Sequence, residues 1–278
     1  MNFINFNGNI VPANQPVLIA GNRGFKFGDG LFESIRMIGG KIKFANYHAE
    51  RLRNGMQALK LEGHPMFDEL FFKEKIVELA ERNGLVENAH IRFTVYRDAD
   101  GLYSPTANKS GYLIEMETTS DASYVANSKG LIVDVFDELT KPVNYLSNYK
   151  TCNALIYVMA GLYRKERSLD EVFIINQNGF LCEGMSSNIF VLFNGKLYTP
   201  ALTEGCVAGV MRRVVMELAL QKNLPVIEAQ INPNILNEAD EVFLTNASIG
   251  IQWVMGFNSK RYFNQFSRSL LHMLNKES

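Results

Sequence analysis

The sequence predicts an α+β protein built from two domains, and three observations support this prediction. A chain of 278 residues is longer than one small hydrophobic core requires. Segments with strand and helix patterns follow one another without the regular alternation of a βαβ protein. The polar stretch at residues 119–129 has no hydrophobic periodicity and is typical of a connector. We therefore expect a smaller N-terminal domain at 1–120, a connector at 121–129 and a larger C-terminal domain at 130–278.

Turn and capping residues predict the elements of the N-terminal domain. Gly39-Gly40 separates two apolar segments, which predicts a β-hairpin. Asn46 is placed to cap the next helix, in which Leu52, Met56 and Leu59 form one apolar stripe. In full, we predict strands at 31–38, 41–44, 89–96 and 112–118, and helices at 47–61 and 68–82, the second closed by Asn83-Gly84.

The C-terminal domain has turn signals of the same kind. Asn178-Gly179 and Asn194-Gly195 each follow an apolar segment, and Asn-Gly pairs favour the tight turns of hairpins. Apolar runs and helical periodicity define the remaining elements. We predict strands at 131–136, 171–176 and 241–245, and helices at 152–166, 209–222 and 265–275.

Composition excludes several classes of protein. The net charge of −1 lacks the basic surplus of a nucleic-acid binder. No apolar stretch approaches the roughly 18 residues of a membrane span, and the N-terminus does not resemble a signal peptide. The three cysteines form no CxxC pair and the four histidines form no HExxH motif, so we expect no metal site. A cytoplasmic location fits these features best.

Six segments of the chain resemble one known family in content and in order. They are FGDGLFESIR (27–36), YHAERL (47–52), YKTCNAL (149–155), EGMSSNIF (183–190), GVMRRVVMELA (209–219) and ADEVFLTNASIGIQWV (239–254). Together they resemble the class IV, or fold type IV, pyridoxal-phosphate enzymes. That family contains branched-chain aminotransferases, D-amino-acid aminotransferases and 4-amino-4-deoxychorismate lyases. The resemblance implies the two-domain fold of the D-amino-acid aminotransferases, with a smaller N-terminal α/β domain and a larger, mixed α/β, barrel-like C-terminal domain.

The resemblance also implies a cofactor, pyridoxal 5'-phosphate, and the residues that hold it. Lys150 resembles the lysine that binds the cofactor aldehyde covalently and then moves protons. Glu183 resembles the carboxylate that pairs with the pyridine nitrogen, and an anion there keeps that nitrogen protonated. Arg51 resembles the arginine that binds the phosphate, for which a guanidinium is well suited.

Backbone N–H groups are the other expected phosphate ligands. Val210 and Met211 begin a predicted helix, whose free N–H groups and dipole form an anion site. Met211 stands where the family often has threonine, so the backbone contact can persist without the hydroxyl. Ala247 and Ser248 resemble a second phosphate-binding turn. Ser187 and Asn188 also match the family pattern, although they could equally serve only to begin a strand.

The substrate side of the resemblance favours the lyases, which release pyruvate and form 4-aminobenzoate. Ser34 matches a hydroxyl residue of the lyases, and Asn153 in KTCNAL matches their asparagine. Arg97 and Tyr103 match the substrate loop, but its second arginine is absent. A branched-chain or D-amino-acid aminotransferase therefore remains the alternative. In either case we expect a small amino substrate and a homodimer.

A third possibility is a relative that binds a ligand without catalysing a reaction. A protein that had lost catalysis would be expected to lose its reactive lysine first. Lys150, Glu183 and Arg51 are all present, and this argues against it.

Overall fold

The computed structural model describes residues 2–277 and divides the chain into two compact units. Unit 1 extends to Ala122 and also includes Tyr149–Asn153. Unit 2 consists of Ser123–Asn148 and of the chain from Ala154 onward. The chain therefore leaves unit 1, returns to it for five residues and leaves it again. The sequence did not predict this return, which carries Lys150.

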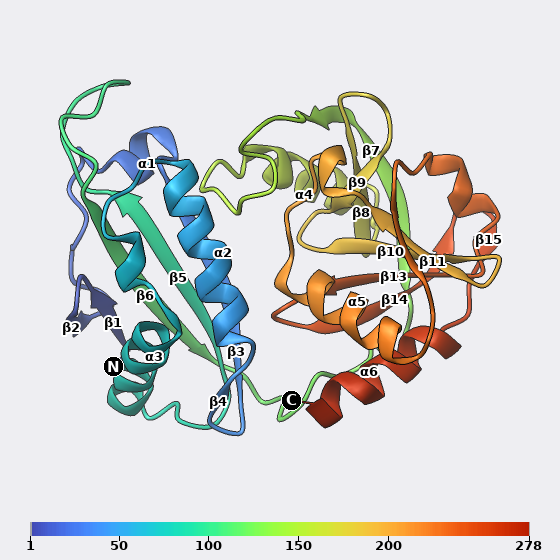
Figure 1. Cartoon of the computed structure of the whole chain (residues 1–278), viewed down its shortest axis with the longest axis horizontal. Coiled ribbons are helices and arrows are strands. Elements are labelled where there is room, and N and C mark those ends of the chain that lie inside the picture. The colour runs from blue at the N-terminus through green and yellow to red at the C-terminus, as the bar shows by residue number, and fades with distance from the viewer. Residues whose placement is uncertain (1, 278) are drawn as a thin grey trace. The chain divides into compact units, whose positions relative to one another are not determined.

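Unit 1 is built on an antiparallel sheet (Figure 1). Its strands are β1 (Phe3–Phe6), β2 (Asn9–Pro12), β3 (Gly30–Ile38), β4 (Lys41–Ile42), β5 (Ala89–Arg97) and β6 (Ser110–Thr118), in the order β2-β1-β6-β5-β3-β4. The predicted hairpin joins β3 to β4. Gly39 and Gly40 both have positive φ, 55° and 73°, which glycine adopts without strain. The hairpin of β1 and β2 was not predicted.

The helices of unit 1 are α1 (Arg23–Phe27), α2 (Ala45–Ala58), α3 (Glu69–Asn83) and the short 3-10 helix η1 (His64–Met66). The prediction for α3, 68–82, agrees with the structure to within one residue at each end. The Asp68 side chain accepts a hydrogen bond from the Phe71 N–H at 2.8 Å, and Gly84 ends the helix with φ 67°. The predicted cap of α2 is wrong. Phe44, in a left-handed conformation, precedes this helix without a side-chain cap, because the chain turns into α2 directly after β4.

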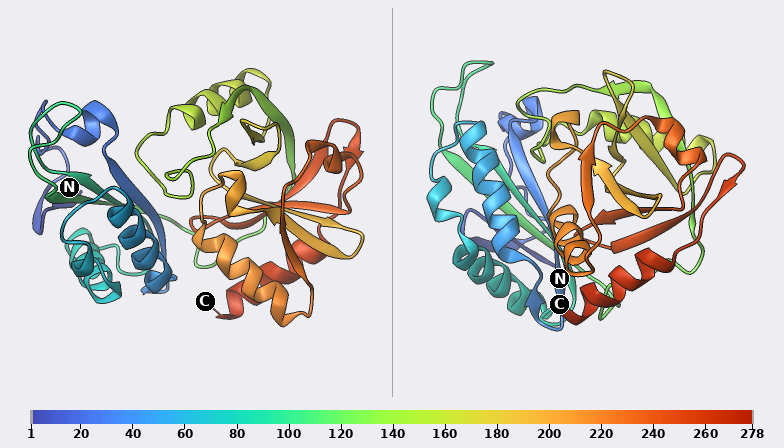
Figure 2. Two further views of the ribbon diagram at one scale, coloured as in Figure 1. Left: turned by 45° about the horizontal axis from the view of Figure 1, so that its top comes forward. Right: turned by 45° about the vertical axis from the view of Figure 1, so that its right-hand side comes forward.

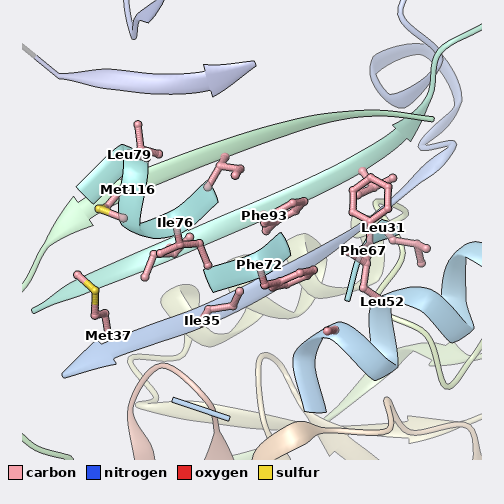
Figure 3. Packing of buried hydrophobic residues seen from close by; sticks show 14 of the residues in the cluster. Leu31, Ile35, Met37, Leu52, Phe67, Phe72, Ile76, Leu79, Phe93 and Met116 are labelled. Atoms are coloured by element: carbon pink, nitrogen blue, oxygen red, sulfur yellow. The ribbon is translucent and has the colours of Figure 1, made fainter. Parts of the chain in front are cut away.

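The core of unit 1 lies between one face of the sheet and the helices α2 and α3 (Figure 3). Leu52 of α2 and Phe72 of α3 meet Ile35 and Phe93 of the sheet, and all four are at most 1% exposed. Burial of each such side chain contributes about 1.5–3 kcal/mol. Because side chains alternate along a strand, the residues between the core positions of β3, including Phe32, point to the opposite face.

Unit 2 contains a mixed sheet that curls into a partial barrel. Its strands are β7 (Leu131–Lys141), β8 (Glu171–Asn176), β9 (Leu181–Gly184), β10 (Asn188–Phe193), β11 (Lys196–Pro200), β12 (Val226–Ala229), β13 (Glu241–Asn246), β14 (Gly250–Phe257) and β15 (Lys260–Arg261). The order is β12-β11-β10-β13-β14-β7-β8-β9, and β15 pairs with β14. The edge strand β9 also lies close to β10, which curls the sheet. Both predicted Asn-Gly hairpins are present.

The helices of unit 2 are α4 (Leu155–Glu166), α5 (Val210–Gln221) and α6 (Gln265–Glu277), with 3-10 helices η2 (Leu202–Glu204) and η3 (Pro233–Asn237). The helix α4 begins at Leu155 rather than at the predicted residue 152, because the preceding residues pair with β3. The helices α5 and α6 lie side by side against β13 and β14 (Figure 2). Within residues 2–277, no helix has the length and apolar character needed to cross a membrane.

Candidate active site

Lys150 is fixed in unit 1 by backbone pairing with the start of β3. The Phe32 N–H donates to the Lys150 carbonyl at 2.9 Å, and the Cys152 N–H donates to the Gly30 carbonyl at 2.9 Å. These bonds form an isolated antiparallel bridge in which Thr151 lies opposite Leu31. The Lys150 Nζ lies 4.2 Å from the centre of the Phe32 ring. A cation at this distance from an aromatic face is attracted to it.

Arg92 is a second cation at the same ring, and the sequence analysis did not identify it. Its guanidinium carbon lies 3.7 Å from the centre of the Phe32 ring. Arg92 is directly opposite Ser34 in the pairing of β3 with β5. Opposite residues of an antiparallel pair share a face, so Ser34, Arg92 and Phe32 belong to the face of the sheet away from the core. An exposed guanidinium in this position can bind a carboxylate.

Arg51 is engaged by a buried carboxylate of its own unit. Its Nε donates to Glu33 at 2.8 Å, and its Nη2 donates to the other oxygen of the same carboxylate. His48 Nδ1 lies 2.6 Å from Glu33 as well. Burial alone would raise the pKa of Glu33, but Arg51 and His48 lower it to about 2. Burial lowers the pKa of His48; the hydrogen bond to Glu33 and its charge oppose this change, and the charges of Arg51 and Lys150 reinforce it.

Arg97 and Tyr103, the expected loop residues, have other partners in unit 1. Arg97 donates to Asp29 at 2.9 Å, to the Asn108 side chain at 2.6 Å and to the Leu59 carbonyl at 2.6 Å. These contacts join three segments of the unit, and they account for a buried arginine without a substrate. Tyr103 is 89% exposed and its ring lies 5.5 Å from that of Phe27.

Asn153 also has a packing role in unit 1. Its side-chain amide donates to the Gly28 carbonyl at 3.1 Å. A Cβ on residue 28 would lie 2.7 Å from the Asn153 side-chain oxygen, and Gly28 has φ +63°. Close packing between Asn153 and Gly28 therefore explains why position 28 is a glycine and gives the Asn153 amide a structural partner.

Glu183 is a buried carboxylate of unit 2, at the end of β9. One of its oxygens is paired with the ammonium of Lys141 and accepts a hydrogen bond from the Tyr157 hydroxyl at 2.7 Å. The other oxygen accepts from the Val207 N–H at 2.8 Å. Neither Lys141 nor Tyr157 was identified from the sequence, where both resemble ordinary surface residues. The acceptor expected at position 183 is therefore a charged group in a fixed orientation.

The start of α5 provides backbone donors in unit 2. Gly209 precedes the helix, and no side chain caps its first turn. A Cβ on Gly209 would collide with the side-chain oxygen of Asn188, whose amide nitrogen donates to the Val207 carbonyl at 2.9 Å. Asn188 thus holds the entry to the helix. The N–H groups of Val210 and Met211, at the positive end of the helix dipole, are suited to an anion.

Ser187, Ala247 and Ser248 gather around Asn246 in unit 2. The Asn246 amide nitrogen lies 3.3 Å from the Ser187 hydroxyl, and its oxygen accepts from the Ser248 N–H at 3.0 Å. The Ala247 carbonyl accepts from the Tyr124 hydroxyl at 3.2 Å. The Ser248 N–H expected to bind phosphate therefore already has an acceptor, whereas Val210 and Met211 retain the geometry of an anion site.

The structure assigns the predicted residues to both units. Unit 1 contains Lys150, Arg51, Ser34, Arg97 and Tyr103, and unit 2 contains Glu183, Ser187, Asn188, Val210, Met211, Ala247 and Ser248. Within unit 2, contacts link Glu183 and Asn188 to the loop before α5. Among residues 2–277, no three or more His, Cys, Asp or Glu side chains are grouped to hold a metal ion.

Comparison with known proteins identifies a family and its members. A family profile described as amino-transferase class IV matches residues 30–255. A Methanocaldococcus jannaschii protein named as a branched-chain-amino-acid aminotransferase is 27% identical over 89% of this chain and 85% of that protein. The D-alanine aminotransferase of Staphylococcus epidermidis is 26% identical over 87% of this chain and 84% of its own.

Solved structures share the fold over nearly the whole chain. The branched-chain aminotransferase of Thermoproteus uzoniensis with norvaline matches with a TM-score of 0.89 at 21% identity, covering 99% of this chain and 94% of that one. A Legionella pneumophila protein named as a 4-amino-4-deoxychorismate lyase matches at 0.86 and 23%, covering 96% and 97%. A Brucella abortus aminotransferase bound to pyridoxal phosphate matches at 0.85 and 19%, covering 99% and 98%. These likenesses confirm the predicted fold class.

Proposed function

The chain belongs to the class IV aminotransferase family of enzymes, and we propose that it uses pyridoxal phosphate to transfer the amino group of a small substrate that bears a carboxylate. The position of the Lys150 amine carries the proposal. Backbone pairing with β3 fixes this lysine, and the Phe32 ring contacts both its Nζ and the guanidinium of Arg92. A reactive amine and a carboxylate-binding cation thus lie on one face of one sheet.

Residues of unit 2 fit the other groups of this cofactor. Glu183 is a buried carboxylate, paired with Lys141, that can accept a hydrogen bond from a ring nitrogen. The uncapped first turn of α5, with Val210 and Met211, suits a phosphate. Asn188 keeps that turn in place through its contact with Gly209. We assign these residues as the cofactor ligands of unit 2.

Each residue then has a defined part in the reaction. When bound, pyridoxal phosphate supplies an aldehyde for the attachment of an amine and a ring that accepts electrons. Lys150 provides the amine for attachment, and its Nζ, once displaced, moves a proton from or to the substrate α-carbon. Arg92 binds and orients the substrate carboxylate. Glu183 holds a proton on the ring nitrogen.

The Arg51 guanidinium is assigned a supporting part at the phosphate. Glu33 already pairs with two of its nitrogens and compensates its charge, so Arg51 contributes less net attraction for an anion than an unpaired arginine would. The N–H groups of α5 therefore supply the main attraction for the phosphate. On this view Glu33 and His48 keep Arg51 in one orientation.

Pyruvate elimination from 4-amino-4-deoxychorismate is the second candidate. Ser34 supports it, since this hydroxyl residue lies opposite Arg92 on the exposed face of the sheet. Asn153, the other residue that favoured elimination, has a structural partner, because it packs on Gly28. The D-alanine aminotransferase of Staphylococcus epidermidis adds support for amino transfer, which we therefore place first.

Two measurements test the proposal. The purified protein should take up pyridoxal phosphate with a visible absorbance, and borohydride reduction followed by peptide mass spectrometry should locate the adduct on Lys150. A Lys150→Ala protein that retains the same adduct would overturn the assignment of the lysine. A matched Lys196→Ala variant, changed at an exposed lysine of β11, should label as the wild type does.

The reaction is decided by its products. We expect D- or L-amino acids together with 2-oxoglutarate to yield the corresponding oxo acid and glutamate. Pyruvate and 4-aminobenzoate formed from aminodeoxychorismate, without any amino transfer across the panel, would establish elimination instead. If the cofactor-loaded protein reacts with none of these substrates, the result would favour a protein that binds a ligand without catalysing a reaction.

A further inference from the structure

The carboxylate of Glu183 accepts hydrogen bonds from three donors of the protein itself. Its Oε1 takes both the Lys141 ammonium and the Tyr157 hydroxyl, and its Oε2 takes the Val207 N–H. A carboxylate offers about four lone-pair positions. Three are used by the protein, and the remaining one is on Oε2. Glu183 is therefore held in a single orientation with one position left to accept a further donor.

Lys141 is a buried ammonium whose contacts are directed at Glu183. It ends β7, after an irregularity in the pairing with β8 that follows Phe136. Its side chain is only 8% exposed. Besides Glu183 it donates to the Ser147 carbonyl at 3.3 Å, and its Nζ lies 5.6 Å from the centre of the Tyr157 ring. Burying a lysine is costly unless a partner compensates it, and here Glu183 is that partner.

Among the titratable groups around Glu183, Lys141 carries the positive charge that pairs with its carboxylate. Burial alone would lower the pKa of Lys141, but the Glu183 carboxylate raises it well above its ordinary value. Burial, followed by the charge of Glu183, raises the pKa of Tyr157 and of Cys182. Burial also raises the pKa of Cys206 to about 12. These three groups are neutral near pH 7.

Two other charged side chains lie near the pair. Glu204 of η2 and Arg212 of α5 interact electrostatically with the buried cysteines beside Glu183. Each has its own partner: Glu204 accepts from Asn176 at 2.8 Å, and Arg212 is paired with Glu228 at 2.6 Å. Lys141 is therefore the residue whose charge acts directly on the Glu183 carboxylate.

We propose that Lys141 is a positioning residue that orients Glu183 and weakens it as a proton acceptor, so that Lys141 sets how firmly the cofactor ring nitrogen keeps its proton. This inference rests on the proposed function, in which Glu183 faces that nitrogen. An ammonium on one carboxylate oxygen reduces the negative potential at the other. The charge of residue 141 therefore tunes the electron-accepting strength of the cofactor, although Lys141 needs no contact with it.

The absorbance of the bound cofactor, followed against pH, tests this role. Lys141→Met and Lys141→Gln both remove the charge, and the glutamine can still donate a hydrogen bond to Glu183. In both variants the electrostatic potential at the Glu183 carboxylate becomes more negative. The pH midpoint of the absorbance change should therefore rise by about one unit or more. Lys141→Arg retains the charge and should stay near the wild-type midpoint. Lys196→Met is the matched surface control and should not shift.

The outcomes separate this proposal from the one on which it rests. A purely structural role would lower the stability of Lys141→Met and Lys141→Gln while leaving the midpoint unchanged, and that result overturns the inference. If Lys141→Met does not fold, Lys141→Gln gives the same test, because it preserves the hydrogen bond. A wild-type protein that takes up no cofactor overturns the proposed function itself and this inference with it.

A second variant distinguishes charge from hydrogen bonding. Tyr157→Phe removes one neutral donor from Glu183 but no charge. Its midpoint should move less than that of Lys141→Gln. An equal or larger shift in Tyr157→Phe would mean that the number of donors, rather than the ammonium, governs the carboxylate, and it would contradict the role assigned to Lys141.

Discussion

The amine of Lys150 lies 4.2 Å from the centre of the Phe32 ring. The same ring is 3.7 Å from Arg92, so one aromatic side chain holds two cations. Phe32→Leu keeps apolar bulk but removes the aromatic face. We expect its free energy of unfolding to fall by about 1–2 kcal/mol in the cofactor-free protein, together with slower turnover. Phe32→Tyr keeps the face and should match the wild type in denaturant titrations; equal losses in the two variants would argue against this role.

Arg92 is expected to bind the substrate carboxylate. Arg92→Gln should raise KM for an amino acid by about tenfold or more, since a charged hydrogen bond is worth roughly 1.5–3 kcal/mol. The matched amine that lacks the carboxylate should react equally with both proteins. The measurement is kcat/KM for each substrate pair. Arg268→Gln, at an exposed position of α6, is the control. A uniform loss on both substrates would contradict carboxylate binding.

Arg97 is expected to stabilise unit 1 rather than to bind substrate. Arg97→Gln breaks a buried ion pair with Asp29, which keeps Arg23 as its other partner, and should lower the free energy of unfolding by about 1.5–3 kcal/mol. In the folded fraction, KM for the amino substrate should change by less than about twofold. Calorimetry and steady-state kinetics below the unfolding temperature measure the two effects. Unaltered stability with a large rise in KM would restore the substrate role.

Glu33 makes the stability of the protein sensitive to acid. Its pKa is lowered from 4.5 to about 2 in the folded state, so its contribution is complete above pH 4.5 and is lost as the pH falls toward 2. That contribution is on the order of 3 kcal/mol. Glu33→Gln should therefore be less stable at neutral pH and should lose less stability between pH 4.5 and 2. Glu115→Gln, at an exposed position of β6, should unfold as the wild type does at every pH.

Gly209 is required by the side chain of Asn188. Its backbone, with φ −65° and ψ 136°, would accept alanine, so any cost of Gly209→Ala arises from the collision with the Asn188 oxygen. We expect a loss of about 1–3 kcal/mol in stability and weaker binding of the cofactor phosphate. The double variant Asn188→Ala/Gly209→Ala should recover part of both losses. Purely additive effects in this cycle would contradict direct coupling.

Local signals in the sequence predict most of the fold. Gly39-Gly40 and the two Asn-Gly pairs locate hairpins because tight turns need residues that tolerate positive φ. Asp68 and Gly84 set the ends of α3 for equally local reasons. The cap of α2 was mispredicted because Phe44 adopts a left-handed conformation that its side chain does not suggest. The pairing of residues 149–153 with β3 depends on contacts between distant segments, which short-range patterns do not encode.

Prediction of the site depended on ordered family segments, and its supporting residues were missed. Lys150, Glu183 and Arg51 lie inside such segments, whereas Lys141 and Arg92 resemble surface charges on strands. Burial separates them in the structure: Lys141 is enclosed with Glu183, and Arg92 stays exposed beside Phe32. A charged residue on a strand shows which face it occupies only after its register is known.

The return of residues 149–153 to unit 1 has a consequence for biosynthesis. The ribosome delivers the first 122 residues and then a part of unit 2 before the residues that bridge to Leu31 have been made. A nascent chain that stops earlier lacks the amine altogether, and one that stops soon afterward lacks Glu183 and α5. On the proposed assignment, Lys150, Glu183 and the start of α5 are therefore all present only after α5 has been made, and a fragment encoding either unit alone lacks part of this set.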